Sequence, residues 1–323
     1  QLEIGGGFGG KTTVYLEPVA VLLSRKSGRP VRLAMSRDEV FRATGPAPGS
    51  VTDIRMAADR DGRIVAVDMD FKYHAGAYPA ITASSGAGSA LAHYKVANAR
   101  IVGWEVLCNR PATKAYRAPG APQTVFAVEC ALDEIAQALG IDQIEIRLRN
   151  AVEPGDRQIS GVPHGHIGFV ECLEAARAHP HWSAPLGKNQ GRGVAGGSWG
   201  NYGGPSTAEV SVADDGSMLV ATGSPDIGGS RAAMAQMAAE SLQVPYDKVR
   251  VVIADTSSIG FSMVTGGSRT TFATGKAVTE AAQKVVEIVR DRAARQWGVD
   301  PGNVEWRDGE AICLAGEKAG ERL

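Results

Sequence analysis

Hydrophobic residues recur at three- and four-residue spacing in several segments of the chain, a pattern that predicts amphipathic helices. The four longer segments each follow a glycine-rich passage at once or within a few residues, and glycines after the first two mark their ends. The predicted helices span residues 12–26, 123–139, 230–242 and 274–297, with a shorter one at 169–178.

Short stretches rich in β-branched residues lie between these helices and predict strands. Two pairs of them flank Asp-Gly turns, at Asp61-Gly62 and Asp215-Gly216, which indicates one hairpin in each half of the chain. The predicted strands span residues 51–56, 64–71, 208–212, 218–222 and 249–254. Helices and strands mix without a strict alternation, so we expect an α+β fold made of two similar mixed lobes.

The likeliest boundary in the chain is the proline- and glycine-containing stretch between Ala151 and Arg192. A length of 323 residues also suits about two domains. We therefore predict a first lobe at residues 1–155, a linker at 156–192 and a second lobe at 193–323.

Composition narrows the functional classes. Hydrophobic residues make up 44% of the chain and charged residues 21%, as in ordinary globular proteins. The formal net charge of -1 gives no long-range attraction to nucleic acid or to an anionic membrane, and no run approaches the ~20 apolar residues of a membrane span. We expect a cytoplasmic location and leave the periplasm open, since the chain starts at Gln1 rather than Met and the lack of a signal peptide is uninformative.

The cysteines and histidines give no sign of a metal centre. Cys108, Cys130, Cys172 and Cys313 are far apart in sequence, so we expect isolated buried thiols and no iron–sulfur cluster. The histidines are scattered. The pairs His164-x-His166 and His179-x-His181 could bind metal but are expected to have loop or surface roles, and the helix methionines Met234 and Met237 are expected in the core. The six histidines are His74, His93, His164, His166, His179 and His181.

Glycine is unusually abundant, with 40 residues, and it gathers in four loops. These loops are residues 5–10, 117–120, 226–229 and 266–269. Glycine lets backbone approach a ligand closely because it has no Cβ. The first loop, residues 5–12, also matches the phosphate-binding pattern GxxxxGK[ST], and residues 251–255 resemble the strand that carries the metal-binding aspartate of such enzymes. A P-loop NTPase is therefore an alternative, but its loop needs a preceding buried strand and only Leu2-Glu3-Ile4 precedes this one.

The same loop, Gly-Gly-Gly-Phe-Gly-Gly-Lys, resembles the signature loop of the molybdenum hydroxylases, the xanthine dehydrogenase/aldehyde oxidase family. Further segments are similar to that family in order and spacing, so the resemblance covers nearly the whole chain. They are residues 28–32, 36–39, 109–123, 144–150 with Gly155-Asp156, 223–234 and 266–277. The resemblance identifies the chain as an internal fragment of the molybdenum-cofactor-binding large subunit.

Members of this family insert oxygen from water into a C–H bond, using molybdenum held by a pterin. The resemblance implies molybdopterin or its cytosine dinucleotide form as cofactor, a partner iron–sulfur subunit, a flavin subunit carrying FAD, and a small-molecule substrate. It also implies that Phe8, Arg117, Gly228 and Ser268 face one cleft. The implied cofactor-binding residues are Gly6, Gly7, Phe8, Gly9, Gly10, Tyr116, Arg117, Ala118, Gly228, Gly229, Ser268, Arg269 and Thr270. The last three suit a plain helix cap equally well.

Several departures from the family pattern limit the substrate and the activity. Thr12 replaces the acidic residue that purine-oxidising members carry after the loop lysine, and residues 84–92 lack their substrate-orienting arginine. The family's Gly-Gln-Gly is Gly228-Gly229-Ser230 here. We therefore expect an aldehyde or N-heterocycle as substrate rather than xanthine.

The family's general base is absent from the sequence. It is a glutamate in a Gly-Glu-Pro run, and no Gly-Glu pair here precedes proline; the family's upstream glutamine loop is also missing. Removing a proton from metal-bound water needs a positioned base. We assign no catalytic and no metal-ligating residue, expect a chain truncated at both ends and inactive alone, and keep a non-catalytic pterin-binding module as the alternative.

Overall fold

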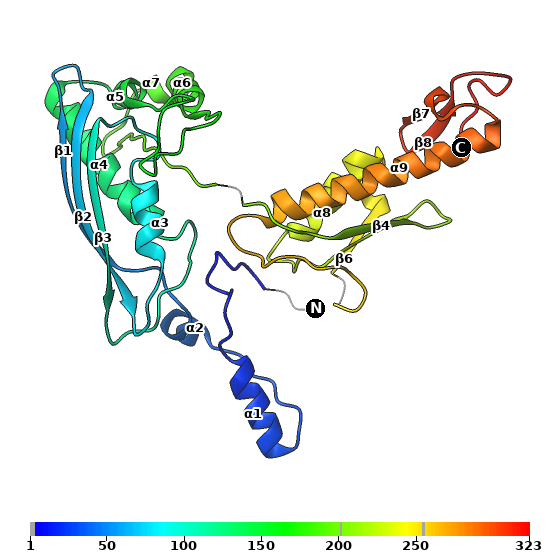
Figure 1. The fold of residues 1–323 in the computed structure, drawn as a ribbon, viewed down its shortest axis with the longest axis horizontal. Helices are drawn as coiled ribbons and strands as arrows, with labels where there is room; N and C mark the ends of the chain where they lie inside the picture. Colours follow the sequence, from blue (N-terminus) through cyan, green and yellow to red (C-terminus); the bar gives the residue numbers. More distant parts are fainter. Residues whose placement is uncertain (1–3, 201, 254–255) are drawn as a thin grey trace. The chain divides into compact units, whose positions relative to one another are not determined.

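The protein is described by a computed structural model that covers residues 4–200, 202–253 and 256–323 (Figure 1). The chain folds into two compact units. The first unit is Thr13–Trp199, and the second unit is Gly200–Leu323 together with the start of the chain up to Thr12. Each unit is described by itself.

The first unit is built on a three-stranded sheet in the order β1-β2-β3. β1 and β2 form an antiparallel hairpin, and β3 runs parallel to β2 after a helix. Its elements are α1 (Glu17–Ser27), α2 (Arg37–Ala43), β1 (Ser50–Ala58), β2 (Ile64–Gly76), α3 (Thr82–Ser89), β3 (Asn98–Leu107), α4 (Ala121–Leu139), α5 (Gln143–Asn150), α6 (Phe169–Ala178) and α7 (Pro180–Ser183).

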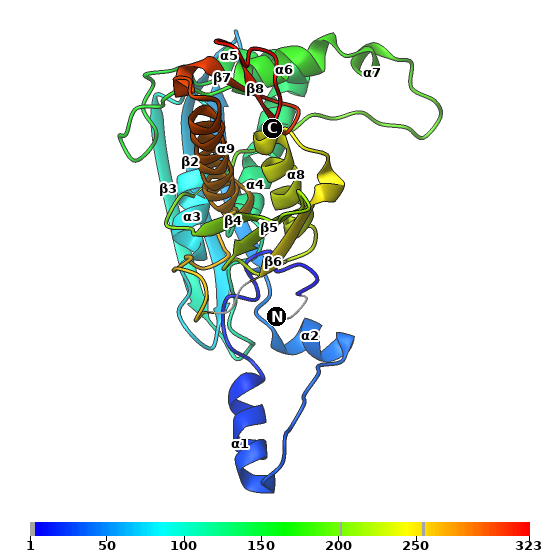
Figure 2. The same ribbon diagram turned by 90° about the vertical axis from the view of Figure 1, so that its right-hand side faces the viewer.

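The second unit repeats this arrangement. β4 and β5 are antiparallel, and β6 lies parallel to β5 after a helix (Figure 2). Its elements are β4 (Ala208–Val212), β5 (Met218–Thr222), α8 (Ser230–Leu242), a 3-10 turn (Tyr246–Lys248), β6 (Val249–Ile253), a π-helical turn (Thr270–Thr274), α9 (Gly275–Trp297), a second 3-10 turn (Pro301–Asn303), β7 (Val304–Arg307) and β8 (Glu310–Cys313).

Both units therefore follow the order strand, strand, helix, strand, helix, with one antiparallel and one parallel pairing. This confirms the expected α+β class and the two similar mixed lobes. The domain limits at residues 155 and 192 remain a prediction. Helix α6, which lies in the predicted linker, belongs to the first compact unit.

The core of the first unit lies between the sheet and the helices α3 and α4. Alternate residues of β2 point inward, and Phe71 is fully buried against Leu132 of α4 and its neighbours. Gly103 of β3 lies opposite Phe71, and a Cβ there would come within 2.5 Å of the Phe71 ring. A glycine at this position therefore makes room for the aromatic ring.

The core of the second unit lies between its sheet and α8 and α9. Val220 of β5, Met234 of α8 and Val278 of α9 are buried together, which confirms the core position expected for Met234. The far end of α9 covers the β7–β8 hairpin, where Trp297 is 9% exposed. No helix among the described residues is long and apolar enough to span a membrane.

Two sequence expectations are corrected. The first helix begins at Glu17, not at residue 12, with Pro18 in its first turn, where proline suits a helix start. Only Cys313 is buried, whereas Cys130 and Cys172 are exposed and Cys108 is half-buried.

His93 lies in a turn of the first unit and is buried, with 2% exposure. Its ring packs 5.0 Å from that of Phe169, between centroids. Burial lowers the pKa of His93, partly offset by the nearby Glu129 carboxylate. The neutral imidazole is thus favoured in this apolar setting.

A buried ion pair joins α4 to α5 in the first unit. The Arg147 side chain is 0% exposed and donates from Nε to Glu129 Oε2 at 2.8 Å and from Nη2 to Asp133 Oδ1 at 2.8 Å. Glu129 also accepts hydrogen bonds from the Tyr94 hydroxyl and from the Gly196 amide. Every charged atom of the pair has a partner, so removing one member would leave the other charge buried and uncompensated.

We expect Arg147→Met to lower the free energy of unfolding by about 3–5 kcal/mol, because it leaves the Glu129 carboxylate without its cation in a buried site. Arg42→Met is the matched control, since Arg42 pairs with Asp38 on an exposed helix face. That control should change stability by about 0.5 kcal/mol or less. Urea denaturation of both variants checks this, and equal losses would contradict it.

Candidate functional site

The first glycine loop has a backbone that few residues other than glycine can adopt. Gly5, Gly6 and Gly9 have φ angles of 63°, 90° and 87°, and Phe8 between them has φ 52°. The Phe8 ring turns back over Gly6, where a Cβ would lie 2.8 Å from Phe8 Cε2. The loop therefore exposes its backbone while folding its one large side chain onto itself.

Three of the four predicted loops lie together in the second unit. The Gly6 amide donates to Ile227 O at 2.8 Å, which joins the first loop to the loop before α8. A Cβ on Gly266 would lie 3.7 Å from Thr12 Cγ2, so the loop before α9 adjoins as well. Tyr116, Arg117 and Ala118 belong to the first unit, and their share in one cleft stays a prediction.

Backbone strain coincides with the predicted site. Phe8, Arg117, Ala118 and Ser268 are non-glycine residues with positive φ, at 52°, 36°, 53° and 59°. Such a conformation costs on the order of 1–3 kcal/mol per residue and persists only where surrounding structure imposes it. The remaining examples among the described residues are Asn189, Gln243 and Asp308. Four of these strained residues lie in loops that resemble the family's cofactor loops, and strained backbone is common at ligand sites.

The loop before α8 is organised by Asp226, which the sequence did not single out. Its carboxylate accepts from the Gly228 amide at 3.0 Å, the Ser230 amide at 3.1 Å and Arg231 Nε at 2.6 Å. The Arg231 guanidinium, helped by the Ser230 hydroxyl and the amides, holds the pKa of Asp226 well below its usual range against the effect of burial. The N-terminus of α8 thus already carries an anion from its own chain.

The N-terminus of α3 in the first unit is treated in the same way. The Glu105 carboxylate accepts from the Ala80 amide at 2.9 Å and the Ala83 amide at 2.8 Å. The later helix of each unit, α4 or α9, instead follows a loop with strained residues, Arg117–Ala118 or Ser268. The first amides after these strained residues are therefore the better donors for an external anion.

Arg269, a predicted cofactor contact, is 2% exposed and points inward. Its guanidinium donates to the backbone oxygens of Gly203, Met263, Gly204 and Pro205 and to Ser206 Oγ, at 2.7–3.0 Å. No carboxylate among the described residues pairs with it. The side chain can act on a ligand only through its charge, while Ser268 beside it is exposed.

A small hydroxyl-lined cavity lies between β5, α8 and the π-helical turn. Ser224 Oγ and Thr274 Oγ1 are 2.8 Å apart in its wall, and the buried Thr270 Oγ1 has no hydrogen-bond partner. Neither Ser224 nor Thr274 carried a sequence signal, because their proximity depends on packing across 50 residues. The cavity has room for about one water molecule.

The structure does not support a P-loop. A P-loop needs its helix to begin at the lysine, so that helix amides face phosphate, but α1 begins only at Glu17. The Lys11 ammonium instead donates back to the Ile4 carbonyl. Asp255 of the supposed metal-binding strand lies outside the described residues.

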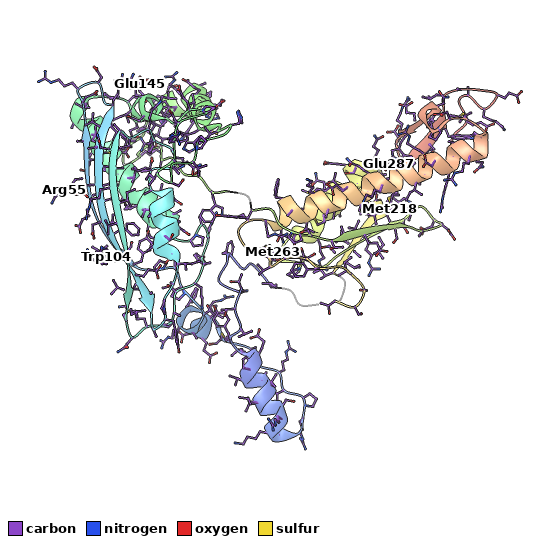
Figure 3. The ribbon with its side chains drawn as sticks, in the orientation of Figure 1. Arg55, Trp104, Glu145, Met218, Met263 and Glu287 are labelled. Carbon is purple, nitrogen blue, oxygen red and sulfur yellow. The ribbon has the colours of Figure 1, made fainter. Side chains whose placement is uncertain are left out.

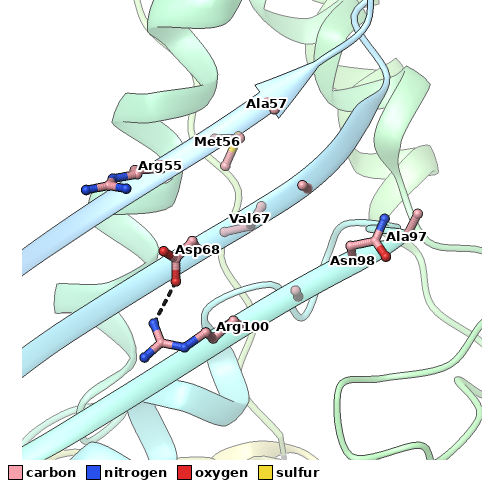
Figure 4. A pocket seen from close by; sticks show the side chains of 10 residues that line it. Arg55, Met56, Ala57, Val67, Asp68, Ala97, Asn98 and Arg100 are labelled. Atoms are coloured by element: carbon pink, nitrogen blue, oxygen red, sulfur yellow. Dashed lines mark hydrogen bonds and ion pairs between the residues drawn. The ribbon is translucent and has the colours of Figure 1, made fainter.

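A separate hollow lies along the sheet of the first unit (Figure 4). Arg100 and Asp68 form a 2.8 Å ion pair there, with 62% and 49% of their side chains exposed, and Arg55 lies on the neighbouring strand. A pair so exposed contributes little. None of the predicted site residues lines this hollow. Among the described residues, no group of three or more His, Cys, Asp or Glu could hold a metal ion.

Comparison with known proteins gives one consistent family. Two models described as molybdopterin cofactor-binding domain match residues 1–151 and 171–321. The xanthine dehydrogenase molybdenum-binding subunit of Escherichia coli O157:H7 is 35% identical over 311 residues, covering 90% of this chain and 41% of that protein. The aldehyde oxidoreductase molybdenum-binding subunit PaoC of Escherichia coli K12 is 31% identical over 320 residues, covering 95% and 42%.

Solved structures agree. Quinoline 2-oxidoreductase from Pseudomonas putida 86 superposes with a TM-score of 0.82 at 26% identity, over 97% of this chain and 44% of that one. An aldehyde oxidoreductase from Desulfovibrio desulfuricans gives a TM-score of 0.78 at 29% identity, over 91% and 35%. The chain therefore spans about two fifths of the length of the curated relatives it matches.

We expect no binding of Mg-ATP to this chain, because its glycine loop lacks the helix that would point amides at phosphate. Titration calorimetry with Mg-ATP checks this, with Lys11→Ala as the comparison. Magnesium-dependent binding that disappears in Lys11→Ala would contradict the conclusion.

We expect Asp226→Asn to destabilise the chain by about 1–2 kcal/mol at pH 7, since it removes charge-assisted bonds at the start of α8. The folded-state pKa of Asp226 is lowered, so its contribution is fully present above the unfolded value of about 3.9 and is lost as pH falls below it. Denaturant titrations at several pH values should show the two proteins converging below about pH 4. A gap that widens in acid would refute this.

Proposed function

The chain belongs to the molybdopterin cofactor-binding domain family, and we propose that it forms the cofactor-holding part of a molybdenum hydroxylase subunit. The whole protein would oxidise an aldehyde or an N-heterocycle with water as the oxygen source. When bound, the molybdenum–pterin group supplies the redox chemistry of that reaction. The residues of this chain bind and orient it.

One observation carries the proposal. Three of the loops that resemble the family's cofactor loops hold non-glycine backbone at positive φ, at Phe8, Arg117, Ala118 and Ser268. A long cofactor needs many backbone donors and little side-chain bulk, and such loops supply both. The residues proposed to contact it are Gly6, Gly7, Phe8, Gly9, Gly10, Tyr116, Arg117, Ala118, Gly228, Gly229, Ser268, Arg269 and Thr270.

Charge suggests how the loops of the second unit divide the cofactor between them. Asp226, itself paired with Arg231, already accepts from the Gly228 and Ser230 amides, so these two amides are engaged by a carboxylate of the chain and not by a ligand. The loop at Ser268 has the buried Arg269 charge and the start of α9 behind it. We therefore assign the phosphate end to Ser268–Thr270 and the uncharged pterin portion to Gly228–Gly229.

The partners and the location remain part of the proposal. We expect an iron–sulfur subunit, because the cysteines of this chain are too far apart to hold a cluster. The family resemblance adds a flavin subunit with FAD, and we expect a cytoplasmic location with the periplasm left open. Among the described residues, no base for deprotonating water is placed at the loops, so we assign no catalytic residue to this chain. A non-catalytic pterin-binding module is the second candidate, and turnover by the complete protein distinguishes the two.

Substituting a loop glycine tests the proposal in the protein expressed from its complete reading frame with its partner subunits. Gly229 and Gly298 both have positive φ, 87° and 69°, and an added Cβ meets nothing within 4 Å at either. Alanine at each should therefore cost a similar ~1–2 kcal/mol of stability. Only Gly229→Ala places a methyl group on the proposed cofactor surface, so it alone should lower bound pterin several-fold.

Metal analysis, pterin fluorescence and dye-coupled oxidation of aldehydes and N-heterocycles provide the readouts. The 323-residue chain alone should contain little molybdenum and show no turnover. Equal pterin content in both alanine variants would count against the loop assignment. Stoichiometric cofactor without turnover in the complete protein would favour the non-catalytic module.

A further inference from the structure

Arg269 is a buried cation whose acceptors among the described residues are all uncharged. It is 2% exposed, and Nε, Nη1 and Nη2 donate to four backbone carbonyls and one hydroxyl rather than to a carboxylate. Burying an arginine is costly unless its hydrogen bonds are satisfied. These hydrogen bonds, called here the Arg269 cage, therefore fix the backbone of residues 203–206 and of Met263.

Most of the carbonyls belong to residues 203–206, which lead into β4 of the second unit. Gly204 has φ 108°, and a Cβ there would lie 2.7 Å from Met263 Sδ, so this segment passes very close to residues 261–263. The Met263 amide donates to Pro205 O at 3.0 Å, and the Thr207 amide donates to Ser262 Oγ at 3.2 Å. Met263 is labelled in Figure 3.

The cage is coupled to the conformation of the loop before α9. Gly267 and Ser268 immediately precede Arg269 with φ angles of 67° and 59°. This left-handed turn directs the Arg269 side chain inward while Ser268 stays exposed. A serine does not adopt this conformation readily, so the hydrogen bonds of Arg269 offset its cost. Tyr202 packs on Gly267, where a Cβ would come within 2.9 Å of Tyr202 Cδ2.

We infer that Arg269 is a positioning residue, which holds the Ser268–Thr270 backbone ready for the anionic end of the cofactor without touching the cofactor through its side chain. The inference rests on the proposed function. The geometry calls for arginine specifically, because five donors in one plane reach carbonyls on two segments at once. Lysine retains the charge with three donors on a single atom.

Arg290 of α9 provides a matched control. It donates from Nε to Val304 O at 2.8 Å and from Nη2 to Pro301 O at 3.2 Å, so it too fixes a neighbouring segment through backbone carbonyls. It lies about 30 Å further along the helix direction than Arg269, at ~1.5 Å per residue. Methionine at either position removes an arginine clamp, but only one clamp adjoins the loop.

Hydrogen–deuterium exchange on the 323-residue chain separates the two clamps. Arg269→Met should raise exchange about tenfold or more in residues 203–207 and also at the amides of 268–272. Arg290→Met should do so only near residues 301–304. If Arg269→Met unfolds the unit, Arg269→Lys replaces it, with a smaller rise at the same two segments. Unchanged exchange at 268–272 while 203–207 loosens would overturn the inference.

Pterin content of the complete protein gives a second readout. Arg269→Met should lose bound pterin several-fold more than Arg290→Met after both are compared at equal loss of thermal stability, and Arg269→Lys should restore part of it. Losses that follow stability alone would overturn the positioning role. If the complete wild-type protein never contains pterin, while Arg269→Met still raises exchange at residues 203–207 and 268–272, the proposed function is refuted and the Arg269 clamp stands.

Discussion

The structure depends on matching buried charge with backbone. In the first unit Glu129 and Arg147 neutralise each other, and the carboxylate also fixes the Gly196 amide. In the second unit Arg269 has no carboxylate among the described residues and takes carbonyls instead. Each charge would be costly alone, so each makes a particular backbone path obligatory rather than merely favourable. These hydrogen bonds fix the backbone conformation of irregular segments that lie outside the short sheets.

Positive φ is the second constraint, and it links the repeated architecture to the proposed site. The same order of strands and helices in both units places a tight loop ahead of α4 and another ahead of α9. Arg117 and Ala118 in one, and Ser268 in the other, adopt left-handed backbone. The first glycine loop does the same at Phe8. Positive φ at Gln243 and Asp308 serves a helix end and a hairpin turn, so the support for a ligand-binding role comes from the coincidence of the other positions with loops that resemble cofactor loops.

Much of the architecture was predictable from the sequence because it rests on local patterns. The spacing of Val278 and Val285 gave α9, and Asp-Gly turns gave both hairpins. β3 was missed because an edge strand carrying Gly103, Trp104 and Glu105 has no clear alternation. The predicted start of the first helix at residue 12 was wrong, because α1 begins at Glu17 with Pro18 in its first turn. The burial of His93 could not be predicted, since it follows from packing against Phe169, which is distant in sequence.

The candidate site, like the fold, was predictable from the sequence only in part. Glycine-rich motifs identified its loops, but they could not show which donors each loop keeps for a ligand. That depends on Asp226 turning its carboxylate onto the amides beside it, and on Arg269 turning away from the surface toward residues 203–206. The two loops of one unit thus differ in what engages them: the Asp226–Arg231 ion pair occupies the amides of one loop, whereas the Arg269 cation beside the other has no carboxylate partner among the described residues.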